Sequence, residues 1–91
     1  MKTAYKIIVQ GRVQGVGFRW FTLQHAQRLK LKGYVSNLPN GNVEVFVQGD
    51  ESSLQELILI LRKGPSFSYV TDLLINDANF DNSLNNFNVK Y

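Results

Sequence analysis

The hydrophobic periodicity of this chain changes along its length in an order that few folds accommodate. Alternating apolar residues predict strands, and apolar residues spaced three and four apart predict helices. Strands are expected at Tyr5–Gln10, Gly33–Leu38, Asn42–Gln48, Tyr69–Ile75 and a short last segment with Phe87, Val89 and Tyr91, and helices at Phe18–Lys30 and Glu51–Lys63. The resulting order is β-α-β-β-α-β plus a terminal strand, which is the split βαβ arrangement. The pattern therefore predicts an α+β, ferredoxin-like sandwich, with an antiparallel sheet and both helices on one face.

Short local signals predict where these elements end. Asn40-Gly41 lies between two β-rich runs and favours a hairpin turn. Ser52 followed by Gln55 is typical of a capping box at the start of the second helix. Gly64-Pro65 would stop that helix.

Composition limits the chain to one domain and removes several classes of site. Its 91 residues make a single domain, 1–91, with 44% hydrophobic residues to build a core. It has no cysteine, which excludes disulfide scaffolds, cysteine-ligated zinc and thiol nucleophiles. No apolar run reaches the roughly 20 residues of a membrane span, and the N-terminus shows no signal-peptide pattern. We therefore expect a cytoplasmic protein with no membrane partner.

The net charge of +3 suits an anionic ligand, although it does not separate a phosphate metabolite from a nucleic acid. The acidic residues Asp72, Asp77 and Asp81 match no known metal-binding loop, so we expect no metal site.

Leu59 and Ile60 lie off the apolar stripe of the second helix and are open to two interpretations, partial burial or a contact between copies. We expect a monomer.

The segment most informative about chemistry is the glycine-rich stretch Gly11–Gly17, between the first strand and the first helix. Backbone N–H groups can converge there, and the helix N-terminus adds partial positive charge, so an anion with several oxygens is a natural ligand. Arg19, in the first helical turn, could grip two phosphate oxygens with its planar guanidinium. Two common phosphate motifs do not fit, because Gly17 is followed by Phe18 and not Lys, and Trp20 stands where the dinucleotide motif has its last glycine.

Two motifs in this chain resemble the signatures of the acylphosphatase family. The first is Gly11-Arg-Val-Gln-Gly-Val-Gly-Phe-Arg19, and the second is Gly33-Tyr-Val-Ser-Asn37 followed by Gly41. The resemblance covers nearly the whole chain. It implies a hydrolase that cleaves the carboxyl–phosphate bond of acyl phosphates to a carboxylate and inorganic phosphate, without a metal, a cofactor or a phosphoenzyme.

The resemblance also implies roles for named residues. The main-chain amides of the first motif and the side chain of Arg19 would hold the phosphoryl group, and Asn37 would orient the attacking water. Arg19 and Asn37 are therefore the expected catalytic residues. The expected phosphate-binding residues are Gly11, Arg12, Val13, Gln14, Gly15, Val16, Gly17, Phe18 and Arg19. The family further implies that a terminal carboxylate at Tyr91 approaches the arginine.

One departure and two alternatives accompany this resemblance. Ser36 stands where the family usually has Lys, Arg or Gln. It is the only local argument for a non-catalytic anion-binding domain with the same fold. An RNA-binding module is the alternative from another class, because Lys32-Gly33-Tyr34-Val35 begins like the K/R-G-F/Y-G/A element of RNA-recognition domains. The small residue and the later aromatics of that element are absent, so we expect no nucleic-acid partner.

Overall fold

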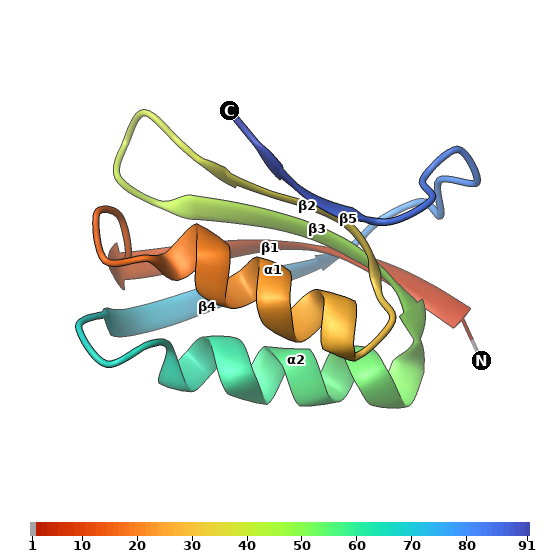
Figure 1. Cartoon of the computed structure of the whole chain (residues 1–91), viewed down its shortest axis with the longest axis horizontal. Helices are drawn as coiled ribbons and strands as arrows, with labels where there is room; N and C mark the ends of the chain where they lie inside the picture. The colour runs from red at the N-terminus through yellow and green to blue at the C-terminus, as the bar shows by residue number, and fades with distance from the viewer. Residues whose placement is uncertain (1) are drawn as a thin grey trace.

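A computed structural model describes residues 2–91 of the chain. Five strands and two helices follow one another in the expected order (Figure 1). The elements are β1 (Lys2–Arg12), α1 (Phe18–Arg28), β2 (Lys32–Asn37), β3 (Val43–Asp50), α2 (Glu51–Lys63), β4 (Tyr69–Asp77) and β5 (Phe87–Lys90). The predicted ferredoxin-like α+β class is confirmed.

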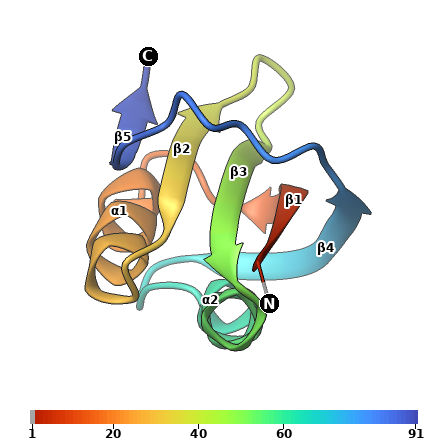
Figure 2. The same cartoon turned by 90° about the vertical axis from the view of Figure 1, so that its right-hand side faces the viewer.

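The strands form one sheet in the order β4-β1-β3-β2-β5. Three of its strand pairs, β1 with β3, β1 with β4 and β2 with β3, are antiparallel, and β5 runs parallel to β2. The terminal strand therefore makes the sheet mixed, where the pattern alone indicated an antiparallel sheet. Figure 2 shows both helices on the same side of the sheet, as expected.

The core lies between the helices and one face of the sheet. In the central strands the residues that face the helices alternate with residues of the opposite face, because successive side chains of a strand point to opposite faces. The fully buried strand residues include Ile7, Val9, Val43, Val45 and Val47, and α2 adds Leu54, Leu57, Ile58 and Leu61. This is the apolar stripe that the helical spacing predicted. Of the two residues off the stripe, Leu59 is 69% exposed and Ile60 is half-buried.

The first strand is longer than expected and takes in the start of the glycine-rich segment. A register shift between Gln10 and Gly11 marks a bulge, after which Gly11 pairs with Val70 and Arg12 with Tyr69. Gly11 has φ of 125°, and a Cβ there would collide with the carbonyl oxygen of Tyr69. This glycine is thus required by the close approach of β1 and β4.

The start of α2 differs from the expected capping box. The N-cap residue is Asp50, and no side chain caps the helix. Gln55 donates instead to a carboxylate oxygen of Glu51 at 2.8 Å, one helical turn earlier. The capping-box prediction was wrong because Ser52 already lies inside the first turn.

The end of α1 carries the one non-glycine residue with positive φ among residues 2–91. Helix α1 stops at Arg28 and not at Lys30, since Lys30 turns left-handed with φ of 60°. The N–H groups of Lys30 and Leu31 donate to the carbonyls of Gln27 and Ala26, which is the Schellman pattern normally closed by glycine.

We expect Lys30→Gly to stabilise the protein, because glycine adopts this conformation without the strain of a Cβ. The gain should be about 0.5–1 kcal/mol in the free energy of unfolding, after the greater freedom of glycine in the unfolded chain is counted. Urea denaturation measures it. Lys32→Gly, an exposed strand position two residues later, is the control and should lose stability. A fall in stability for Lys30→Gly would contradict the assignment of strain to this residue.

Within residues 2–91, no helix is both long enough and apolar enough to cross a bilayer.

Candidate active site

The connection between β1 and α1 is a short loop with its main-chain donors free. It spans residues 13–17, and it turns through two left-handed glycines, Gly15 with φ of 74° and Gly17 with φ of 77°. Gly17 is also the N-cap of α1, without a side-chain cap. The N–H groups of Gly15, Val16 and Gly17 find no acceptor within residues 2–91. Donors left free at a helix N-terminus attract an anion.

Arg19 lies in the first turn of α1, where a cation is ordinarily unfavourable. That turn contains no acidic residue. The only ion pair among the described residues joins Arg28 and Glu56 on the surface, so Arg19 has no carboxylate partner there. A half-buried, unpaired guanidinium beside free amides adds to the attraction for an anion.

Asn37 is the last residue of β2, where it pairs in register with Val43 of β3. Its side-chain Oδ1 is buried and is the only such buried side-chain N or O atom in residues 2–91 without a hydrogen-bond partner. Leaving a buried acceptor unsatisfied costs on the order of 1–3 kcal/mol. Such a cost is commonly found where a group is needed to bind a ligand or a water.

These three parts meet in one cavity of about 190 Å³. Its lining residues are Val13, Gly15, Gly17, Phe18, Arg19, Trp20, Asn37, Val89 and Tyr91. The structure therefore brings together the two expected catalytic residues and four others of the predicted phosphate-binding segment. Among residues 2–91, no carboxylate or imidazole side chain lines this cavity.

Four residues of the predicted phosphate-binding segment do not line the cavity. Gly11 and Arg12 belong to β1, where the bulge and the pairing with β4 account for them. Gln14 and Val16 lie in the loop, but their side chains are not part of the cavity wall.

The side chain of Gln14 holds the loop against the hairpin that follows Asn37. Its Nε2 donates to the carbonyl oxygens of Leu38 and Asn42, both at 2.8 Å. The hairpin itself is closed by the N–H of Leu38, which donates to the same Asn42 carbonyl at 2.8 Å. One amide thus ties the loop at residues 13–17 to the hairpin that follows Asn37.

Two cavity residues, Trp20 and Val89, were not predicted at the site, and a third, Tyr91, was expected there only through its carboxylate. The parallel pairing of β5 with β2 brings the last two there, since Ser36 is opposite Lys90. The guanidinium carbon of Arg19 lies 5.0 Å from the centre of the Tyr91 ring, a cation–π contact. No ion pair between Arg19 and a terminal carboxylate is present in residues 2–91, so the contact with Tyr91 is made by the ring and not by the carboxylate expected from the resemblance.

The cavity can hold a small anion with tetrahedral oxygens and, beside it, a water. Loop amides and a guanidinium supply donors, and the Asn37 oxygen supplies an acceptor. No group of three or more His, Cys, Asp or Glu side chains suited to a metal ion occurs among residues 2–91.

Comparisons with known proteins identify relatives over the full fold. The Acylphosphatase family model matches residues 5–89. An acylphosphatase of Bacillus licheniformis is 42% identical over 87 residues, which cover 96% of this chain and 97% of that protein. The crystal structure of acylphosphatase from Bacillus subtilis is similar with a TM-score of 0.93 and 40% identity, covering 100% of both chains. A structure from Coxiella burnetii, also an acylphosphatase, has a TM-score of 0.90 and 33% identity, covering 98% of this chain and 93% of that one.

Proposed function

We propose how the reaction proceeds in this chain, which belongs to the acylphosphatase family and is an acyl phosphate phosphohydrolase. The amides of the loop at residues 13–17 and the guanidinium of Arg19 hold the phosphoryl group. The Asn37 oxygen accepts a hydrogen bond from a water and directs that water at phosphorus. The observation that carries the proposal is the buried, unpartnered Asn37 Oδ1 in the same cavity as Arg19.

The reaction that these groups support is one in-line displacement. The water oxygen forms a bond to phosphorus while the bond from phosphorus to the acyl oxygen breaks, and the electron pair leaves with the carboxylate. A carboxylate is a good leaving group, so stabilising and aligning the phosphoryl group is the main requirement. Fixed N–H donors and a guanidinium meet it without reorganising during the reaction.

The proton of the attacking water goes to a phosphoryl oxygen of the substrate. The lining residues within the described range 2–91 include no carboxylate or imidazole side chain, and this supports transfer to the substrate. Neither a metal nor a covalent phosphoenzyme takes part in this mechanism. The monomeric state and the cytoplasmic location remain predictions from the sequence.

A turnover assay in excess chelator tests the metal-free mechanism. The purified protein should release inorganic phosphate from a small aryl acyl phosphate at the same rate with and without EDTA. Loss of activity in EDTA that returns on adding Mg²⁺ or Zn²⁺ would contradict the proposal.

Gln14→Met should lower turnover more than it weakens phosphate binding. Methionine keeps the length of the side chain but cannot donate to Leu38 and Asn42, so the hairpin that follows Asn37 is no longer tied to the loop. We expect kcat to fall about tenfold, because small displacements of a positioned group cost rate. The inhibition constant for inorganic phosphate should change less than about threefold, since Arg19 and the loop amides remain.

Steady-state kinetics with phosphate as inhibitor separates the two effects. Gln24→Met, at an exposed position of α1, is the matched control and should behave as the wild type. An equal loss in kcat and in phosphate affinity would assign Gln14 to phosphate binding and refute its role in positioning.

A further inference from the structure

The active-site cavity has an apolar part that the proposed mechanism does not use. Its polar part consists of the loop glycines, Arg19 and Asn37, which the proposed function assigns to the phosphoryl group and the water. The other lining residues are all apolar or aromatic: Val13, Phe18, Trp20, Val89 and Tyr91. An acyl phosphate is divided in the same way, because an organic group is joined to the phosphoryl group through one oxygen. A phosphoryl group bound in this cavity therefore brings its organic group near the apolar residues.

Burial separates these apolar residues into a closed floor and an open rim. Val13 is fully buried and Phe18 is 1% exposed, so both side chains already pack in the core. Trp20 is 61% exposed, Tyr91 is 97% exposed and Val89 is half-buried. We call these last three residues the rim. The rim is the part of the apolar lining that has free surface to offer a ligand.

Trp20 is not needed to build the core. The buried stripe of α1 consists of Phe18, Thr22 and Ala26. Trp20 lies off this stripe, because two residues of an α-helix turn the chain by about 200° away from Phe18. Its indole takes part in no aromatic pair within residues 2–91. A large, exposed and unpaired ring at the mouth of a cavity offers contact area to a ligand.

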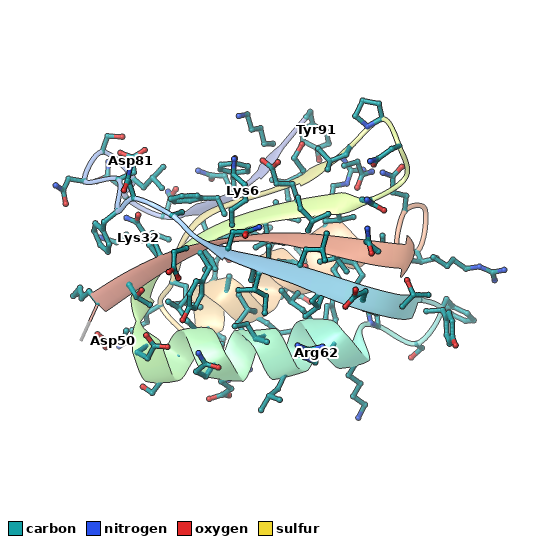
Figure 3. The ribbon with its side chains drawn as sticks, turned by 180° about the vertical axis from the view of Figure 1, so that it is seen from behind. Lys6, Lys32, Asp50, Arg62, Asp81 and Tyr91 are labelled. Carbon is teal, nitrogen blue, oxygen red and sulfur yellow. The ribbon has the colours of Figure 1, made fainter. Side chains whose placement is uncertain are left out.

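The last strand brings the other two rim residues to the cavity. Alternation along β5 turns Val89 to the same face as the buried Phe87, and Tyr91 follows two residues later. Figure 3 shows Tyr91 where the chain leaves this edge strand of the sheet. The Arg19 guanidinium lies against one face of the Tyr91 ring. Because the residue is 97% exposed, the opposite face of the ring is free to stack on a second aromatic ring.

The rim can supply apolar contact but no charge. Its side chains are an indole, an isopropyl group and a phenol. Within residues 2–91, Arg19 is the one cation that lines the cavity, and the proposed function assigns it to the phosphoryl group. An acyl group with a charge of its own would lose water of hydration at the rim without gaining an ionic partner there. The rim therefore favours an uncharged, flat acyl group.

We propose that the rim of Trp20, Val89 and Tyr91 binds the acyl group and makes this chain selective for acyl phosphates whose acyl group is an uncharged aromatic ring. The ring would pack against Trp20 and the free face of Tyr91. This inference rests on the proposed function, because Arg19 and the loop amides must hold the phosphoryl group of the same substrate. The rim residues determine specificity and touch none of the reacting atoms.

Steady-state kinetics with benzoyl phosphate and acetyl phosphate test the proposal. The two substrates share the phosphoryl group and the type of bond that breaks, and only the first carries a ring. We expect kcat/KM to be about fivefold or more higher for benzoyl phosphate, the scale of one aromatic stacking contact. The two leaving carboxylates differ slightly in basicity. The decisive quantity is therefore the change in the benzoyl-to-acetyl ratio of kcat/KM when a rim residue is replaced.

Variants of two rim residues should each lower this ratio. Trp20→Ala should lower it about fivefold or more, and Trp20→Phe, which keeps a ring, should retain most of it. Tyr91→Ala should lower the ratio about twofold or more through the loss of one ring face. Part of its effect should be common to both substrates, since the ring also contacts Arg19. Phe67→Ala removes an aromatic ring that is 82% exposed and outside the cavity lining, and should keep the wild-type ratio.

Two further measurements separate selectivity from other effects. The inhibition constant for inorganic phosphate in Trp20→Ala should stay close to that of the wild type, because phosphate has no acyl group. The urea midpoint of the same variant should also be close to wild type, since Trp20 lies outside the buried stripe. Together they show that a lower ratio comes neither from the phosphoryl site nor from a folding defect.

The outcomes distinguish this inference from the function on which it rests. A ratio unchanged in both Trp20→Ala and Tyr91→Ala, or an equal loss with both substrates in each variant, would overturn the rim as the acyl site and leave the proposed function standing. Wild-type protein that hydrolyses neither substrate would contradict the proposed function and this inference together.

Discussion

Arg19→Ala should lower kcat/KM for an acyl phosphate by about 10³-fold or more, the scale found when a guanidinium that stabilises a transferring phosphoryl group is removed. In the part of the chain that the structure describes, Arg19 is the one cationic side chain that lines the active-site cavity. No other group in the cavity can replace its charge and its two parallel donors. Most of the loss should appear as weaker binding, so the inhibition constant for inorganic phosphate should rise as well.

Two further variants make this result specific. Arg19→Lys keeps the charge without the planar fork and should recover only part of the activity. Arg28→Ala removes another arginine of α1, one that forms a surface ion pair with Glu56, and should retain wild-type kinetics. If Arg19→Ala bound phosphate as tightly as the wild type, Arg19 would not hold the phosphoryl group.

Asn37→Ala should lower kcat by about 10²–10³-fold, by analogy with the loss of one positioned hydrogen-bonding group from an active site. Phosphate should still bind with nearly unchanged affinity, because Arg19 and the loop amides are intact. The same substitution removes the unpartnered buried acceptor. We therefore expect the free energy of unfolding to stay the same or to rise by about 1 kcal/mol.

Kinetics and urea denaturation of the same variant provide the check. Asn88→Ala, which removes an exposed asparagine from β5, is the matched control and should not affect turnover. A large loss of stability in Asn37→Ala would mean that the side chain is structural. Unchanged kcat would mean that it does not position the water.

Much of the fold follows from sequence periodicity alone. The stripe of α2 and the alternation of β3 each fix which side chains face the core, because burial on one face leaves a single consistent register. The limits of α2 at Glu51 and Lys63 agree with the prediction, since Gly64 and Pro65 end the helix. The extra length of β1 was not predicted, because its last residues are held by pairing with β4.

The site was only partly accessible to sequence reasoning. Arg19 was suggested by its place beside the glycine-rich loop, whereas Asn37 came from the resemblance alone. The cavity that contains both required the β2 end to lie beside the start of α1. The presence of Val89, and of the Tyr91 ring in place of its carboxylate, depends on the parallel pairing of β5 with β2, a long-range contact without a local signal. The bracing by Gln14 was also invisible, since a glutamine in a loop has many possible partners.

The central claim is that the cavity directs water at phosphorus and not at the acyl carbon, and hydrolysis in H₂¹⁸O tests it most directly. Products of turnover with an acyl phosphate in labelled water would be separated and analysed by mass spectrometry. The mechanism predicts one ¹⁸O atom in the inorganic phosphate and none in the carboxylate. Label in the carboxylate would show attack at the acyl carbon and would contradict the assignment of every group in the cavity.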